Sequence, residues 1–117
     1  MIIVLNKKIT TEEFQQAREI YPDYIKTVMD IEKEILAVGG EYHIDCEDVL
    51  IKSGSKQENL YGGGYRVSTK EIEYMALSNF KPALNKTTYE IMDEKVRKKL
   101  EELTKKYLEI WEISNFL

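Results

Sequence analysis

The feature that most constrains the fold is an amphipathic segment near the end of the chain, beginning at Asp93. Its apolar residues recur at alternating spacings of four and three, which is the period of a helix with one apolar stripe. They are Val96, Leu100, Leu103, Tyr107 and Ile110. Asp93 is a suitable N-cap. The spacing therefore predicts a long C-terminal helix that must bury its stripe against other elements.

The start of the chain predicts a strand followed by a capped helix. The apolar run Ile2 to Leu5 is typical of a short buried strand. Thr10 and Glu13 have the spacing of a capping box, and Ile9 and Phe14 have that of a hydrophobic staple. We expect a helix that starts after Thr10 and ends before Pro22.

Residues 24–38 fit either a helix or a strand. Helix-forming residues and Gly39 as the C′ residue support a helix. A cleaner alternation supports a strand, with Met29, Ile31, Ile35 and Ala37 on one face and carboxylates on the other. Gly39-Gly40 is a typical two-residue turn. We favour a β-hairpin that turns at these two glycines.

The remaining elements complete a mixed fold. A short helix is expected from Asp45 to Gly54, and strands are expected at Leu60–Val67, Glu71–Lys81 and Tyr89–Met92. The prediction is an α+β fold: a mainly antiparallel sheet of about five to six strands with two to three helices on one face, including the long C-terminal helix. Residues 1–117 form a single domain in this interpretation.

Composition narrows the class of protein. Hydrophobic content is 43%, charged content 32%, formal net charge −4, and there is one cysteine. These values predict an ordinary globular protein without a disulfide framework, and we expect a cytoplasmic location with no membrane partner. The acidic balance counts against nucleic-acid binding.

The predicted hairpin would bring acidic residues and the single histidine together. Pairing across Gly39-Gly40 would place Asp30, Glu32, Glu34, His43 and Asp45 on one face. Asp30, Glu32 and Asp45 could then hold a divalent cation, magnesium or manganese, which is the one cofactor the residues suggest. His43 and Asp45 are the candidate catalytic residues. The alternative is an ordinary solvated face.

The glycine-rich region is a candidate ligand site. Ser55, Gln57, Gly62 and Gly63 could bind a ligand, because a triple glycine leaves room beside a polar loop. A bulge or a close approach by another backbone is the alternative. No phosphate-loop motif is present. Cys46 is expected to be a buried thiol, and one histidine with one cysteine excludes a structural zinc site.

The last residues, EIWEISNFL, are unusually apolar for a chain end. They could dock on the chain's own sheet or mediate a homodimer.

Taken together, the motifs resemble a family of small prokaryotic proteins catalogued as a domain of unknown function. The resemblance extends over nearly the whole chain. Its residues are Asp30-Ile31-Glu32, His43, Asp45, Glu47, Gly54-Ser55, Gln57, Tyr61-Gly62, Lys81-Pro82, Glu90-Ile91, Asp93 and Arg97. Tyr61 stands where the family pattern has tryptophan and Lys81 where it has arginine, which counts against a role that needs a bidentate guanidinium. The resemblance implies a stand-alone domain and implies no activity.

Three functions remain open from the residues. The first is a module that binds a ligand or partner around His43, Asp45, Gln57 and the triple glycine. The second is a metal-dependent hydrolase or nuclease that uses the acidic cluster with His43. The third is a toxin-like RNA-binding protein that uses Lys81, Lys86 and Arg97, against which the acidic charge counts.

Overall fold

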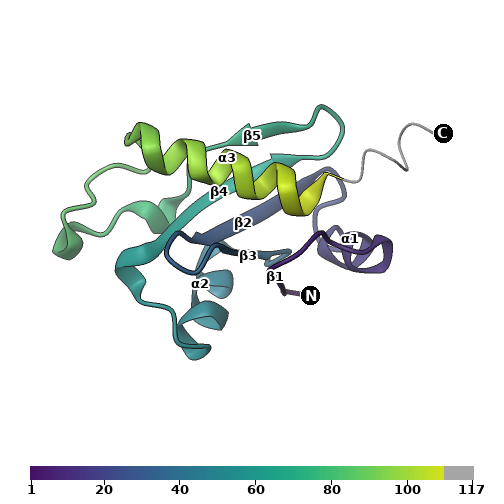
Figure 1. Cartoon of the computed structure of the whole chain (residues 1–117), viewed down its shortest axis with the longest axis horizontal. Coiled ribbons are helices and arrows are strands. Elements are labelled where there is room, and N and C mark those ends of the chain that lie inside the picture. Colours follow the sequence, from purple (N-terminus) through teal and green to yellow (C-terminus); the bar gives the residue numbers. More distant parts are fainter. Residues whose placement is uncertain (110–117) are drawn as a thin grey trace.

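The chain builds one antiparallel sheet with helices on both faces, as a computed structural model of residues 1–109 describes it (Figure 1). The five strands are β1 (Ile3–Leu5), β2 (Tyr24–Asp30), β3 (Ile35–Val38), β4 (Leu60–Arg66) and β5 (Glu71–Glu73). Their order across the sheet is β1-β3-β2-β4-β5, and all neighbouring pairs are antiparallel. The predicted α+β class is confirmed.

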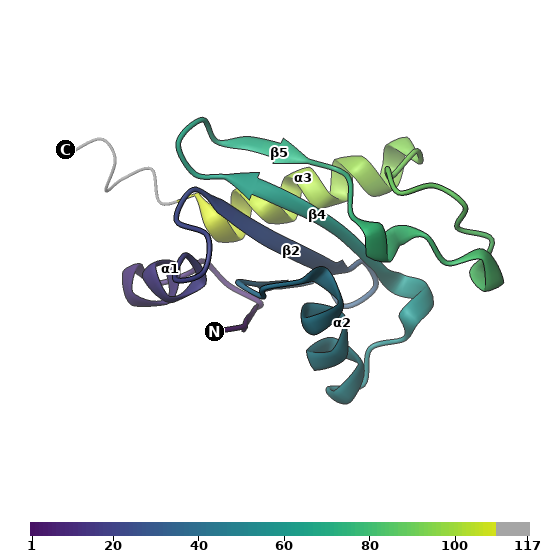
Figure 2. The same cartoon turned by 180° about the vertical axis from the view of Figure 1, so that it is seen from behind.

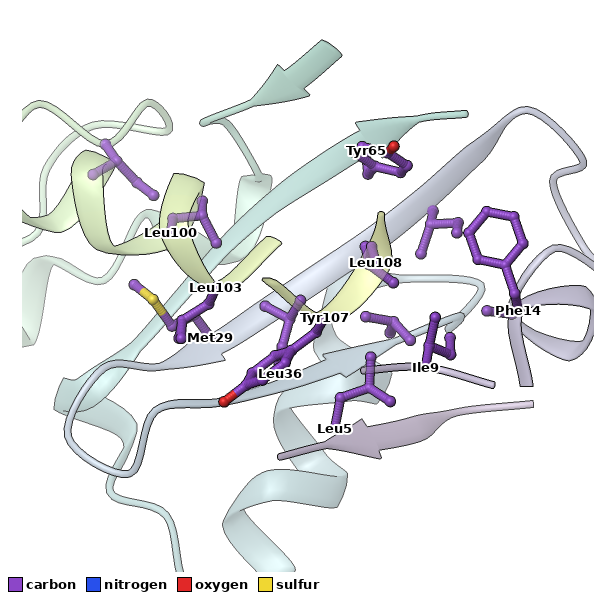
Figure 3. Packing of buried hydrophobic residues seen from close by; sticks show 14 of the residues in the cluster. Leu5, Ile9, Phe14, Met29, Leu36, Tyr65, Leu100, Leu103, Tyr107 and Leu108 are labelled. Carbon is purple, nitrogen blue, oxygen red and sulfur yellow. The ribbon is translucent and has the colours of Figure 1, made fainter. Parts of the chain in front are cut away.

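Three α-helices accompany the sheet in the described residues: α1 (Thr11–Ala17), α2 (His43–Lys52) and α3 (Glu94–Leu108). Asp93 caps α3 as predicted, because its carboxylate accepts hydrogen bonds from the N–H groups of Lys95 and Val96. The apolar stripe of α3 covers one face of the sheet, where Leu100, Leu103 and Tyr107 lie over the strands (Figure 3). Ile110 and the apolar tail lie outside the described residues.

Helix α1 forms through its local signals. The Thr10 hydroxyl accepts the Glu13 N–H at 3.1 Å, and the Glu13 carboxylate accepts the Thr10 N–H at 3.0 Å. Ile9 and Phe14 are both buried in the core that α3 covers. The Ile9 N–H donates to the Tyr107 carbonyl at 2.8 Å, so the entry to α1 is also fixed to α3.

The expectation that the helices lie on one face is wrong. Helix α2 packs on the face opposite α3 (Figure 2), and Cys46 and Leu50 contact a second, smaller core there. That core includes Val28, Ala37 and Leu60 from three neighbouring strands. The central strands are therefore buried on both sides, as in a three-layer arrangement.

Residues 24–38 do form a hairpin, but it turns at residues 31–34 and not at Gly39-Gly40. β2 pairs with β3 from Thr27↔Val38 to Asp30↔Ile35. Within the turn, Glu34 donates its N–H to the Asp30 carbonyl at 2.9 Å and adopts φ +55°. Gly39, at φ +92°, instead redirects the chain from β3 toward α2. The predicted return strand is therefore replaced by the first turns of α2, which begins two residues before Asp45.

The segment after β4 is less regular than predicted. β4 itself confirms the strand expected at Leu60–Val67. Of the strand expected at Glu71–Lys81, β5 alone forms, and the strand expected at Tyr89–Met92 is reduced to an isolated bridge between Met75 and Glu90. Residues 1–109 contain no helix long and apolar enough to cross a membrane.

Candidate functional site

Asp30, the first predicted metal ligand, is a buried structural residue. One carboxylate oxygen accepts the N–H groups of Glu32 and Lys33, both at 3.0 Å, and so stabilises the hairpin turn. The other oxygen accepts the Ser55 hydroxyl at 2.6 Å. These contacts occupy both oxygens with internal donors.

The other predicted metal ligands lie elsewhere. Glu32 accepts a hydrogen bond from the Asn59 amide at 2.8 Å, and Asp45 accepts the Tyr42 N–H at 3.2 Å at the start of α2. The strand pairing across Gly39-Gly40 that predicted this cluster does not form, because the hairpin turns at residues 31–34. Across residues 1–109, no group of three or more carboxylate, histidine or cysteine side chains could hold a metal ion.

The predicted ligand residues are also dispersed. Ser55 is buried against Asp30, and Gln57 is exposed in a 3₁₀ turn at Gln57–Asn59. Gly62 and Gly63 are buried within β4. Both glycines lie beside His43, since the Gly63 carbonyl oxygen is 2.7 Å from His43 Nε2 and a Cβ on Gly62 would sit 3.2 Å from His43 Cδ2.

Close approach, and not a bulge, explains the glycines of β4. Strand β4 pairs with β2 in unbroken register from Tyr24↔Arg66 to Asp30↔Leu60. A Cβ at Gly62 would lie 2.7 Å from the Ala76 side chain, and one at Gly63 would lie 2.5 Å from the Glu73 carbonyl oxygen. A larger residue at either position would displace a packed neighbour.

Asn79 takes the place of a neighbouring strand beside Gly62. Its carboxamide oxygen accepts the Gly62 N–H at 2.7 Å, and its nitrogen donates to the Gly62 carbonyl at 2.9 Å. The same nitrogen donates to the Tyr89 carbonyl at 3.0 Å. β5 leaves β4 after Glu73, so this buried side chain satisfies backbone groups that a longer strand would have paired.

His43, the predicted catalytic residue, is the first residue of α2 and lies over β4. Its Nε2 atom is 2.7 Å from the Gly63 carbonyl oxygen. A carbonyl can only accept, so Nε2 carries the proton. Burial lowers the pKa of His43, the Gly63 hydrogen bond opposes that shift, and the charge of Lys26 adds to it. The imidazole is therefore neutral near pH 7.

A cleft opens beside His43, between the start of α2 and the 3₁₀ turn at Leu77–Asn79. We call it the α2 cleft. It has a volume of about 530 Å³ and is lined by Lys26, Tyr42, His43, Ile44, Leu77 and Ser78. This volume lies within the range of small-molecule sites, roughly 300–1,000 Å³.

Lys26 supplies the charge of the α2 cleft. Its ammonium donates to the Glu41 carbonyl at 2.7 Å and lies 4.7 Å from the Tyr21 ring centre and 5.4 Å from that of Tyr42. No carboxylate in residues 1–109 forms an ion pair with it. The cleft thus contains a positioned ammonium group that has no ion-pair partner in the described chain.

The rim of the α2 cleft is apolar and exposed. Tyr42, Ile44 and Leu77 are 57%, 51% and 79% exposed. Ser78 adds a hydroxyl oxygen that is buried and has no hydrogen-bond partner in the described chain. The cleft therefore combines one cation, two polar groups and three apolar side chains.

A buried ion pair joins α2 to the segment that follows the Leu77–Asn79 turn. Glu47, one turn further along α2, accepts the Lys81 ammonium at 2.7 Å, and the two side chains are 0% and 10% exposed. Lys86 donates to the carbonyls of Glu58 and Leu60. Burial, and then the like charge of Lys81, lower the pKa of Lys86 to about 8.

Two further predicted residues are held by internal contacts. Arg97, which was grouped with Lys81 and Lys86 for RNA binding, contacts Glu90 at 3.3 Å and lies over the Tyr74 ring. Cys46 is buried as expected, and burial raises the pKa of its thiol to about 11. A thiol with so little thiolate at neutral pH is a packing residue.

Sequence reasoning found His43 but missed five of the six residues that line the α2 cleft. Tyr42 and Ile44 flank His43 in the sequence, but exposed apolar residues are common on protein surfaces and gave no signal by themselves. Their place on the rim depends on α2 beginning at His43. Lys26 is far in the sequence from Leu77 and Ser78, and their meeting depends on tertiary packing.

Comparison with known proteins identifies the family. The family model described as a protein of unknown function, DUF5674, matches residues 3–107. No curated protein and no solved structure matches the chain. Because the match covers nearly the whole chain, the chain belongs to the DUF5674 family.

Proposed function

We propose that this protein is a ligand-binding module whose α2 cleft takes a small organic anion with an apolar body. The proposal is carried by Lys26, a cation in a cleft whose charge no described carboxylate neutralises. A ligand carboxylate would supply the missing counter-charge. A partly buried charge pair of this kind is screened by salt much less than an exposed one.

The rim supports an apolar body on the ligand. Tyr42, Ile44 and Leu77 expose large side chains around one opening, and covering them would remove apolar surface from water. Each ligand methylene that becomes fully buried there would contribute about 0.8 kcal/mol. A purely inorganic anion would leave this surface uncovered, so an amphipathic acid fits better.

The test compares a matched acid and amide. We expect 4-methylpentanoate to cause saturable amide shifts at Lys26, Ile44 and Leu77 in ¹H–¹⁵N NMR spectra, and 4-methylpentanamide to bind at least about tenfold more weakly. Lys26→Gln should abolish the difference. Lys52→Gln, at the exposed C-terminal turn of α2, is the control and should leave binding unchanged. Equal binding of acid and amide, or shifts spread over the surface, would refute the proposal.

A further inference from the structure

We infer that His43 makes the α2 cleft selective for organic acids that carry a hydroxyl group beside the carboxylate. This inference rests on the proposed function, because it specifies the class of acid that Lys26 would bind. It concerns a hydrogen-bond acceptor that the protein itself leaves unused.

The orientation of the imidazole determines which atom a ligand can reach. Nε2 lies 2.7 Å from the Gly63 carbonyl, and Cδ2 lies 3.2 Å from the position of a Cβ on Gly62. The Nε2–Cδ2 edge of the ring therefore faces β4. In an imidazole Nδ1 is the atom opposite that edge, so Nδ1 points away from β4.

The protonation of the ring makes Nδ1 an acceptor. The Gly63 carbonyl fixes the proton on Nε2, and the neutral ring then has a lone pair on Nδ1. No donor within residues 1–109 forms a hydrogen bond to Nδ1. A ligand that lies in the α2 cleft can satisfy this atom only with an O–H or N–H group.

The charge of Lys26 favours a hydroxyl over an ammonium as the ligand group that donates to Nδ1. The Lys26 ammonium is close enough to His43 to disfavour positive charge on the ring. A ligand ammonium at Nδ1 would meet the same repulsion, whereas a hydroxyl is neutral. A 2-hydroxy acid offers the carboxylate to Lys26 and the hydroxyl to His43 from adjacent carbon atoms.

The first experiment measures dissociation constants for three acids that share one carbon skeleton. We expect 2-hydroxy-4-methylpentanoate to bind roughly fivefold more tightly than 4-methylpentanoate, which is the effect of one net hydrogen bond, and leucine to bind most weakly. If the two acids bind equally, the selectivity is refuted while the proposed function stands. If neither acid binds, the proposed function fails as well.

The second experiment observes the ring directly. His43 is the only histidine, so ¹⁵N NMR of the imidazole reports on it alone. We expect an unprotonated Nδ1 in the free protein, and a shift of that nitrogen on saturation with the 2-hydroxy acid but not with 4-methylpentanoate. A proton on Nδ1 in the free protein, or equal shifts with both acids, would overturn the inference.

A variant supplies the third measurement. His43→Phe keeps an aromatic ring but removes the acceptor, so the ratio of the two dissociation constants should fall to about one while 4-methylpentanoate still binds. An unchanged ratio would overturn the inference. If this variant does not fold, the ring nitrogens of the wild-type protein still decide the question.

Discussion

Replacing Lys81 with methionine should destabilise this protein far more than removing any surface charge. The Lys81 ammonium lies 2.7 Å from Glu47, whose side chain is fully buried. The second carboxylate oxygen of Glu47 already has no partner among the described residues. Lys81→Met would therefore remove the one ion pair that the buried Glu47 forms in the described chain, a change that costs about 3–5 kcal/mol. That is a fifth or more of the stability of a typical domain, about 5–15 kcal/mol.

The assay is urea unfolding at neutral pH, followed by circular dichroism, with thermal unfolding alongside. A loss of this size should lower Tm by at least about 10 °C. The double variant Lys81→Met, Glu47→Leu replaces the pair with apolar groups and should recover at least about 2 kcal/mol. Lys105→Met is the matched control, because Lys105 pairs with Glu101 at 3.3 Å and both side chains are about half exposed. That control should cost less than about 1 kcal/mol.

The reasoning is refuted if Lys81→Met costs no more than the Lys105 control. It is also refuted if the double variant is as unstable as Lys81→Met alone. In either case the burial of Glu47 would not impose the desolvation cost that the prediction assumes.

Two further variants test the cleft region. Burial lowers the pKa of His43 below its ordinary 6.5, so below about pH 6.5 the unfolded chain binds a proton that the native state resists, and stability should fall as pH falls. Urea midpoints between about pH 7.5 and 5.5 should show this slope in the wild type and less of it in His43→Phe; parallel profiles would contradict it. Asn79→Ala should cost about 2–4 kcal/mol, because it leaves both backbone groups of Gly62 unpaired. The same denaturation assay checks this, and a loss below about 1 kcal/mol would show that water replaces the carboxamide.

The sequence predicted α1 and α3 because both helices have caps formed by nearby residues. The Thr10–Glu13 capping box and the Asp93 cap each involve residues within three positions of one another. The stripe of α3 is periodic enough to specify its buried face. These elements could be predicted because their causes lie within one or two turns of chain.

The hairpin was predicted with the right type and the wrong turn. Gly39-Gly40 has a typical turn composition, whereas the real turn has Glu34 at φ +55°, a conformation that glutamate rarely adopts. The buried Asp30 carboxylate, which Ser55 holds from 25 residues away, stabilises that turn. A contact so distant in sequence leaves no periodic trace. Because the turn was misplaced, the pairing that would have grouped Asp30, Glu32 and Asp45 does not form.

The α2 cleft could be predicted only through His43. Its wall depends on the chain leaving the sheet after Glu73, and the alternation of Glu71–Lys81 indicates a continuous strand. That alternation was overridden because Asn79 satisfies Gly62 from a 3₁₀ turn. Hydrophobic periodicity cannot predict that a side chain such as Asn79 will form the hydrogen bonds of a neighbouring strand.

The contact between Asn79 and Gly62 has a consequence for how the family can diversify. A continuous β5 would impose its two-residue alternation on every position of the wall, and an inserted residue would reverse the faces of all that follow. Here the wall is held by the Asn79 carboxamide, by Ala76 packed beside Gly62, and by the Ala76 N–H, which donates to the Tyr89 carbonyl at 3.1 Å. None of these contacts involves the side chain of Leu77, which is 79% exposed, so this position can change its chemistry without altering the sheet.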